Sequence, residues 1–143
     1  MAFKNILVPI DFTDDGRRVL KVAQELASCT DAHLALLHVG VVTDAALGGA
    51  AGTVYHHLAE QIEGEQRATL ARIAEESVPA EQACSQHLRH GEPALEILAC
   101  AEEGGHDLIV MGTHGRSGIA RVLLGSVAEQ VVRNGAIPVL LVR

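Results

Sequence analysis

The sequence predicts an α/β fold in which one open parallel sheet of five strands carries helices on both faces. The first observation is the order of its segments, since short apolar runs of strand length alternate with longer runs of helical periodicity as β-α-β-α-β-α-β-α-β. The second is that four of the five strand segments are apolar throughout, without polar alternation. Such strands are covered on both faces, and strands separated by helices form right-handed crossovers in a parallel sheet.

The expected strands are short and rich in branched aliphatic side chains. The four apolar strands cover residues 6–10, 34–39, 108–111 and 139–142. The fifth, at 83–88, contains serine, glutamine and histidine, which is typical of a strand at the edge of a sheet.

Apolar residues three and four positions apart predict a helix in each interval between strands. Proline in a first turn, glycine after a last turn and a capping box mark their ends. The expected helices are, in order, residues 14 to 29 with Thr13 as N-cap, residues 56 to 77, a helix from Pro93 to Gly104-Gly105, and a helix that opens with the capping-box pattern Ser126-Val127-Ala128-Glu129 and ends near Gly135.

Length and composition narrow the class of protein. The 143 residues are enough for one domain, which we expect to span residues 1–143, and aromatic residues make up 2%, so the core must be aliphatic. A net charge of −7 opposes non-specific binding to nucleic acid or to an anionic membrane. Cys29, Cys84 and Cys100 form no CxxC pair and are expected to be reduced, partly buried thiols of a cytoplasmic protein. We expect neither a signal peptide nor a membrane span.

A glycine-rich segment follows the fourth strand, where open α/β sheets bind ligands beyond the carboxyl ends of their strands. Gly112, Gly115, Gly118 and Gly125 lead into a helix start, and glycines let main-chain N–H groups approach an anion. The segment has no Gly-Lys-Ser/Thr, and the first strand has no GxGxxG after it, so this is neither a Walker A loop nor a Rossmann fingerprint. It predicts a phosphate cradle, and a tight turn is the alternative.

The spacing Gly112-x2-Gly115-x9-Gly125-Ser126 resembles the ATP-binding signature of the universal stress protein family. The resemblance covers nearly the whole chain. The matching segments are ILVPID at 6–11, LLHV at 36–39, LIVMGTHGRSG at 108–118, LLGSVAE at 123–129 and PVLLV at 138–142.

The resemblance implies a Rossmann-like, adenine nucleotide alpha hydrolase-like fold with strand order 3-2-1-4-5, usually as a homodimer, and ATP bound with Mg²⁺. It implies that Asp11 contacts the ribose or adenine. It further implies Pro9 and Val39 beside the base, Met111 and Gly112 on the ribose side, and Gly115, Gly125, Ser126 and Val127 at the phosphates. Phe12 stands where the family commonly has glycine, and we expect no effect of this change on the site.

Further candidates come from the residues themselves. His114 lies in the cradle loop near the expected phosphates, and Arg116 can help to neutralise them. The chain's histidines and cysteines show no zinc-ligand spacing, so we expect no metal held by protein side chains. Asp11 as an Asx turn and Ser126 as a plain helix cap are the alternative interpretations of these two residues.

Three functions stay open. The first is a cytosolic ATP-binding stress-response regulator or nucleotide sensor that acts as a homodimer through its last strand and signals to an unidentified protein partner. The second is a slow ATP hydrolase or phosphoryl transferase that uses the same pocket. The third is a structural dimer that binds no nucleotide. The cradle contains no lysine, which favours binding over turnover, and we expect no catalytic residue.

Overall fold

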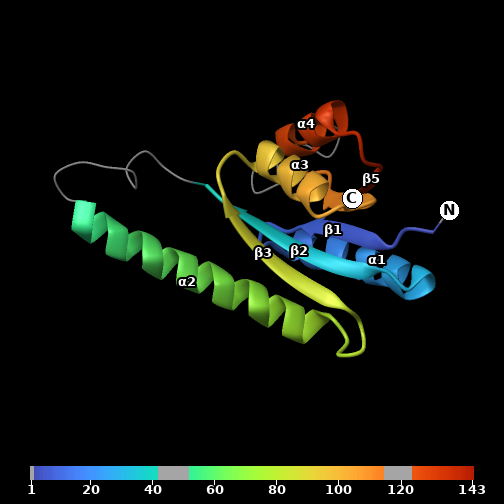
Figure 1. Cartoon of the computed structure of the whole chain (residues 1–143), viewed down its shortest axis with the longest axis horizontal. Helices are drawn as coiled ribbons and strands as arrows, with labels where there is room; N and C mark the ends of the chain where they lie inside the picture. Colours follow the sequence, from blue (N-terminus) through green and yellow to red (C-terminus); the bar gives the residue numbers. More distant parts are fainter. Residues whose placement is uncertain (1, 42–51, 115–123) are drawn as a thin grey trace.

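The computed structural model describes residues 2–41, 52–114 and 124–143 and contains one parallel sheet (Figure 1). Its strand order is β3-β2-β1-β4-β5, which confirms the expected topology. The polar strand lies at one edge, as predicted, and the last strand at the other. The strands are β1 (Asn5–Pro9), β2 (His33–Gly40), β3 (Cys84–His90), β4 (Leu108–Gly112) and β5 (Val139–Val142).

Two pairs of helices cover the two faces of the sheet (Figure 1). One face packs against α1 (Asp14–Thr30) and α2 (Gly52–Ser77), and the other against α3 (Pro93–Glu103) and α4 (Ser126–Asn134). The expected helices are all present, and α2 begins four residues earlier than its apolar spacing predicts. None of the described helices combines the length and the apolar character that a membrane crossing requires.

The core forms two aliphatic layers, one on each face of the sheet. The central strand β1 contributes to both, because Ile6 and Val8 face α1 and α2 whereas Leu7 faces α3 and α4. All three side chains are fully buried. Cys100 is buried and Cys84 half-buried, as expected, but Cys29 is exposed, which corrects the expectation for that thiol.

The order of the strands reverses between β1 and β4. These two strands pair in parallel, with Ile6 opposite Leu108 and Leu7 opposite Ile109. The chain leaves β1 toward α1 on one face, and it leaves β4 toward α4 on the other face. The divergence opens a crevice beyond their carboxyl ends, which is where open α/β sheets bind ligands.

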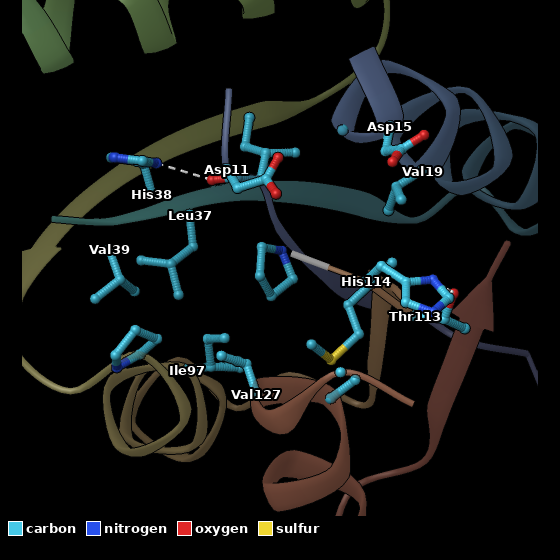
Figure 2. A pocket seen from close by; sticks show the side chains of 18 of the residues that line it. Asp11, Asp15, Val19, Leu37, His38, Val39, Ile97, Thr113, His114 and Val127 are labelled. Atoms are coloured by element: carbon cyan, nitrogen blue, oxygen red, sulfur yellow. Dashed lines mark hydrogen bonds between the residues drawn. The ribbon is translucent and has the colours of Figure 1, made fainter. Parts of the chain in front are cut away.

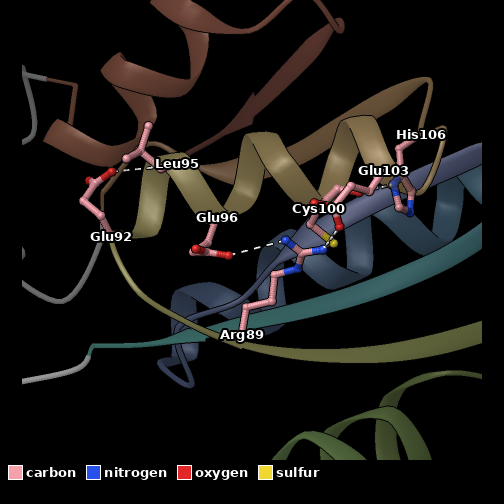
Figure 3. A network of polar contacts seen from close by, with 7 residues as sticks. All are labelled: Arg89, Glu92, Leu95, Glu96, Cys100, Glu103 and His106. Carbon is pink, nitrogen blue, oxygen red and sulfur yellow. Dashed lines mark hydrogen bonds and ion pairs between the residues drawn. The ribbon is translucent and has the colours of Figure 1, made fainter. Parts of the chain in front are cut away.

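A polar network ties the edge strand β3 to helix α3 (Figure 3). The guanidinium of Arg89 forms ion pairs with Glu96, at 3.4 Å, and with Glu103, and its side chain is only 25% exposed. At the start of α3, the carboxylate of Glu92 accepts a hydrogen bond of 3.1 Å from the N–H of Leu95. The network fixes the amino end of α3, which borders the crevice.

Candidate functional site

A cavity of about 340 Å³ lies at the carboxyl ends of β1, β2 and β4, between the first turns of α1, α3 and α4 (Figure 2). Its volume is at the lower end of the range for small-molecule sites. The structure brings together every predicted site residue that it describes; Gly115 and Arg116 lie outside the described residues. The predicted residues that line the cavity are Pro9, Asp11, Val39, Met111, Gly112, His114, Gly125, Ser126 and Val127.

One end of the cavity is apolar. In Figure 2, Leu37 and Val39 of β2 lie opposite Ile97 of α3 and Val127 of α4. Pro9 and Met111 also line the cavity, so that an aliphatic compartment forms from both strands and helices. Such a compartment suits a flat, uncharged ring, which dispersion contacts on both faces would hold.

Asp11 lies between the apolar compartment and the polar end (Figure 2). Its Oδ1 accepts hydrogen bonds from the main-chain N–H of Thr13, at 3.1 Å, and from the hydroxyl of Thr13, at 2.6 Å. This is an Asx turn, so one of the two interpretations of Asp11 is confirmed, and the carboxylate lines the cavity as well. Thr13 occupies the predicted N-cap position of α1, but its side chain bonds to Asp11 and makes no cap hydrogen bond.

The polar end joins the end of β4 to the start of α4. The N–H of Gly125 donates to the carbonyl oxygen of Thr113 at 2.7 Å, and the N–H of Thr113 donates to the carbonyl oxygen of Val142 at 3.0 Å. The hydroxyl of Thr113 also lies 2.9 Å from Nδ1 of His114. The two described parts of the glycine-rich segment therefore meet at one wall of the cavity.

The predicted capping box at the start of α4 is wrong. Gly125 is the N-cap, with extended backbone angles of φ −61° and ψ 153°, and Ser126 is already the first helical residue. The carboxylate of Glu129 is 2.6 Å from the guanidinium of Arg133, one turn farther along the helix. Serine at the first helical position lacks the geometry that directs a cap side chain to the N–H groups of the first turn.

The first turn of α4 nevertheless points at the cavity. Gly125, Ser126, Val127 and Ala128 all line it. The first N–H groups of an α-helix have no partner within the helix, and the helix dipole adds partial positive charge there. The arrangement can bind an anionic group through main-chain donors.

Several cavity residues escaped the sequence analysis. Asp15 and Val19 come from α1, His38 from β2, and Pro93 and Ile97 from α3. For Pro93 and Ile97 the sequence does contain a signal. Pro93 marks the start of the helix after β3, and that helix begins at the ligand-binding edge of the sheet. A histidine within an apolar strand is the signal for His38, which is buried with 1% of its surface exposed.

A second hollow of about 540 Å³ adjoins the polar end of the cavity, between α1 and the end of β5. Asp15, Thr113 and His114 line both spaces. The guanidinium of Arg18 donates to the carbonyl oxygen of Arg143 at 2.9 Å and lies 3.6 Å from Asp15. Among the described residues, no three His, Cys, Asp or Glu side chains converge as ligands of a metal ion.

The sequence of nearly the whole chain matches one known family. The model of the family described as "Usp: Universal stress protein family" matches residues 2–143. The chain belongs to the universal stress protein family. It is similar to Universal stress protein YxiE of Bacillus subtilis (strain 168), with 38% identity over 99% of each chain.

Solved universal stress proteins share this fold. The structure of MJ0577, from Methanocaldococcus jannaschii, matches with a TM-score of 0.86 at 28% identity, over 99% of this chain and 96% of that one. A universal stress protein from Archaeoglobus fulgidus, solved in complex with dAMP, matches with a TM-score of 0.68 at 23% identity over 100% of both chains. At 23% identity, the likeness to the Archaeoglobus fulgidus protein shows a shared fold alone.

Proposed function

We propose that this universal stress protein is an ATP-binding regulator, or nucleotide sensor, of the stress response. One observation carries the proposal: a single cavity is lined by an apolar compartment, by the carboxylate of Asp11 and by the first turn of α4. A nucleotide has a part to match each of these linings, namely a flat base, a sugar with hydroxyl groups and an anionic tail. The Archaeoglobus fulgidus complex with dAMP supports the proposal at the level of the fold.

In the proposed complex, Pro9 and Val39 lie beside the base, and Asp11 accepts hydrogen bonds from the sugar hydroxyls. Met111 and Gly112 border the ribose. A carboxylate repels phosphate, which favours the sugar end for Asp11 and the α4 end for the phosphates. Gly115, Gly125, Ser126 and Val127 surround the phosphates in this proposal, with His114 and Arg116 nearby and Mg²⁺ bound to the phosphates. The proposed donors are the main-chain N–H groups of Gly115, Ser126 and Val127, because the N–H of Gly125 is bonded to Thr113.

We propose that the protein binds ATP and hydrolyses it slowly at most. Efficient phosphoryl transfer needs a positioned base and cations that neutralise the developing charge. None of the described residues that line the cavity is a lysine. The ammonium of Lys4 instead donates to the carbonyl oxygen of Thr30, at 2.7 Å. We expect a turnover well below about 1 s⁻¹, the low end for typical enzymes.

The proposal includes a homodimer in the cytoplasm. The order of the sheet leaves β5 with one unpaired edge among the described residues, and such edges pair readily with another strand. The cytoplasmic location rests on the cysteines, since Cys29, Cys84 and Cys100 are free and are not paired in disulfides. Burial raises the pKa of the Cys84 and Cys100 thiols. Such thiols stay protonated and unreactive.

The test is calorimetric titration of the protein with Mg-ATP, after extraction and chromatography of any nucleotide that copurifies. The matched variants are Gly112→Ala and Gly64→Ala. A Cβ at Gly112 meets Val19 and the His114 carbonyl at 3.5 Å, an ordinary contact, so the fold tolerates it while the cavity narrows. A Cβ at Gly64, in α2, meets nothing within 4 Å. We expect weaker binding in Gly112→Ala alone.

The outcomes separate the three functions. Binding of ATP without released phosphate supports the regulator. Many turnovers per second, lost in Gly112→Ala, would establish the enzyme instead. A wild-type protein that carries no copurified nucleotide and binds none that is added would show that the proposed function is wrong. If light scattering then gives a dimer, the structural dimer is the function that remains.

A further inference from the structure

Phe12, the residue after Asp11, has an unusual backbone. Its φ is +66°, in the left-handed region. This region is uncommon for any residue except glycine, and for a bulky side chain it persists only where the surroundings hold it in place. Glycine adopts such angles without a steric cost, whereas phenylalanine does not.

The contacts that hold Phe12 come from β2. Its ring stacks on the ring of His38, with centroids 3.7 Å apart and an interplanar angle of 15°. His38 is only 1% exposed, and its Nδ1 lies 2.8 Å from the carbonyl oxygen of Ile10. Because a carbonyl oxygen only accepts, this bond places a proton on Nδ1. Figure 2 shows the bond beside Asp11.

One histidine therefore holds the residues on both sides of Asp11. Ile10 is fixed through its carbonyl oxygen, and its N–H also donates to the carbonyl oxygen of Leu37 at 2.8 Å. Phe12 is fixed through its ring. The described hydrogen bonds of the Asp11 side chain are made through Oδ1 to Thr13, inside the same turn. The place of the carboxylate in the cavity is thus set by its neighbours.

We propose that Phe12 and His38 are a positioning pair, which fixes the Asp11 carboxylate where a ligand presents its ribose hydroxyls and thereby gives the site its preference for ribose. This inference rests on the proposed function. A group held in place before the ligand arrives loses no conformational freedom on binding, so it contributes more to affinity and specificity. Phe12 thus has a proposed effect on the site, where none was expected from the sequence.

The simpler interpretation is that Phe12 only fills space. It is half-buried against the core layer of α1 and α2, and so is Phe3, at the opposite end of β1. Phe3 is therefore the matched control, since it packs against the same layer and is absent from the residues that line the cavity. Replacing either ring by alanine removes packing and lowers stability. Only the replacement of Phe12 also removes positioning and alters the ligand preference.

The experiment compares the affinities of Mg-ATP and Mg-2′,3′-dideoxy-ATP by calorimetry in four proteins, namely wild type, Phe12→Ala, Phe12→Tyr and Phe3→Ala. We expect the wild type to prefer ATP by about tenfold or more, as for hydrogen bonds to a charged group. In Phe12→Ala the preference falls to about twofold or less, while the affinity for the dideoxy nucleotide stays within about twofold. Phe12→Tyr keeps the ring and the preference. Phe3→Ala keeps the preference although its melting temperature falls.

The other outcomes are equally decisive. A Phe12→Ala protein that keeps the wild-type preference overturns the positioning role. A wild-type protein that binds both nucleotides equally overturns this inference and the role of Asp11, and leaves nucleotide binding intact. A wild-type protein that binds neither overturns the proposed function together with the inference. Circular dichroism of each variant verifies that it is folded.

Discussion

The main-chain N–H of Gly125 donates a hydrogen bond of 2.7 Å to the carbonyl oxygen of Thr113. Through Thr113, whose own N–H donates to Val142, this bond connects the ends of β4 and β5 to the start of α4. It also brings Gly112 and His114 to the same cavity wall as the first turn of α4. The bond is thus a main-chain link between the sheet and the proposed phosphate donors.

Substitutions at Gly125 isolate this bond. The φ of Gly125 is −61°, which proline adopts, but proline has no N–H to donate. We expect Gly125→Pro to be less stable than Gly125→Ala by about 1 kcal/mol, the net value of one hydrogen bond, and to bind Mg-ATP more weakly. Urea denaturation and calorimetry measure the two effects. Equal stability and affinity of the two variants would show that the link contributes nothing.

Ser126 is expected to contribute little to stability. Loss of an N-cap side chain costs about 0.5–2 kcal/mol, but Ser126 is the first helical residue and its side chain is exposed. We expect Ser126→Ala to change the free energy of unfolding by less than about 0.5 kcal/mol, as surface substitutions do. Chemical denaturation without nucleotide measures it. A loss above about 1 kcal/mol would restore the capping box.

Ser126 also shows where prediction from the sequence ends. The strands and helices were predictable because apolar runs and helical spacing are local signals. The place of the cavity was predictable because the ligand edge of an α/β sheet is set by topology. The N-cap of α4 was wrong by one residue, because glycine and serine are both acceptable N-caps and only the backbone angles of Gly125 decide between them.

Contacts between distant segments had no local signal at all. The stacking of Phe12 on His38 depends on a left-handed backbone at Phe12 and on the packing of β1 beside β2. The Arg89 network depends on which residues of α3 face β3. Composition and spacing show none of these relationships.

Two histidines, the buried His106 and the half-buried His87, make stability depend on pH. The pKa of His106 and the pKa of His87 are lowered below 6.5, chiefly because burial disfavours the charged imidazolium; a further cause for His87 is the positive charge of His106 and Arg89 nearby. Folding thus favours the neutral rings. Their stabilising effect is fully present above pH 6.5 and is lost as the pH falls from there through the lowered pKa values.

We therefore expect the melting temperature to fall between pH 7 and pH 5, and less so in His106→Gln. His106 is 7% exposed, and a glutamine can replace its hydrogen bond to the carbonyl oxygen of Cys100. His57→Gln, on the exposed surface of α2, is the control and should follow the wild type. An unchanged pH profile in His106→Gln would refute the role of His106.

The edge strand β5 carries the last prediction, which concerns the proposed dimer. All four of its residues are aliphatic, and Leu140 is 37% exposed at the edge of the sheet. A lysine on an edge strand opposes pairing with another strand. Light scattering at micromolar concentration should give the wild type about twice the 15.1 kDa of one chain and should give Leu140→Lys a single chain. Leu58→Lys, on α2, is the matched control, because Leu58 is 49% exposed and Figure 1 shows α2 far from β5. A wild type of 15.1 kDa excludes the dimer, and a Leu140→Lys protein that still dimerises places the interface elsewhere.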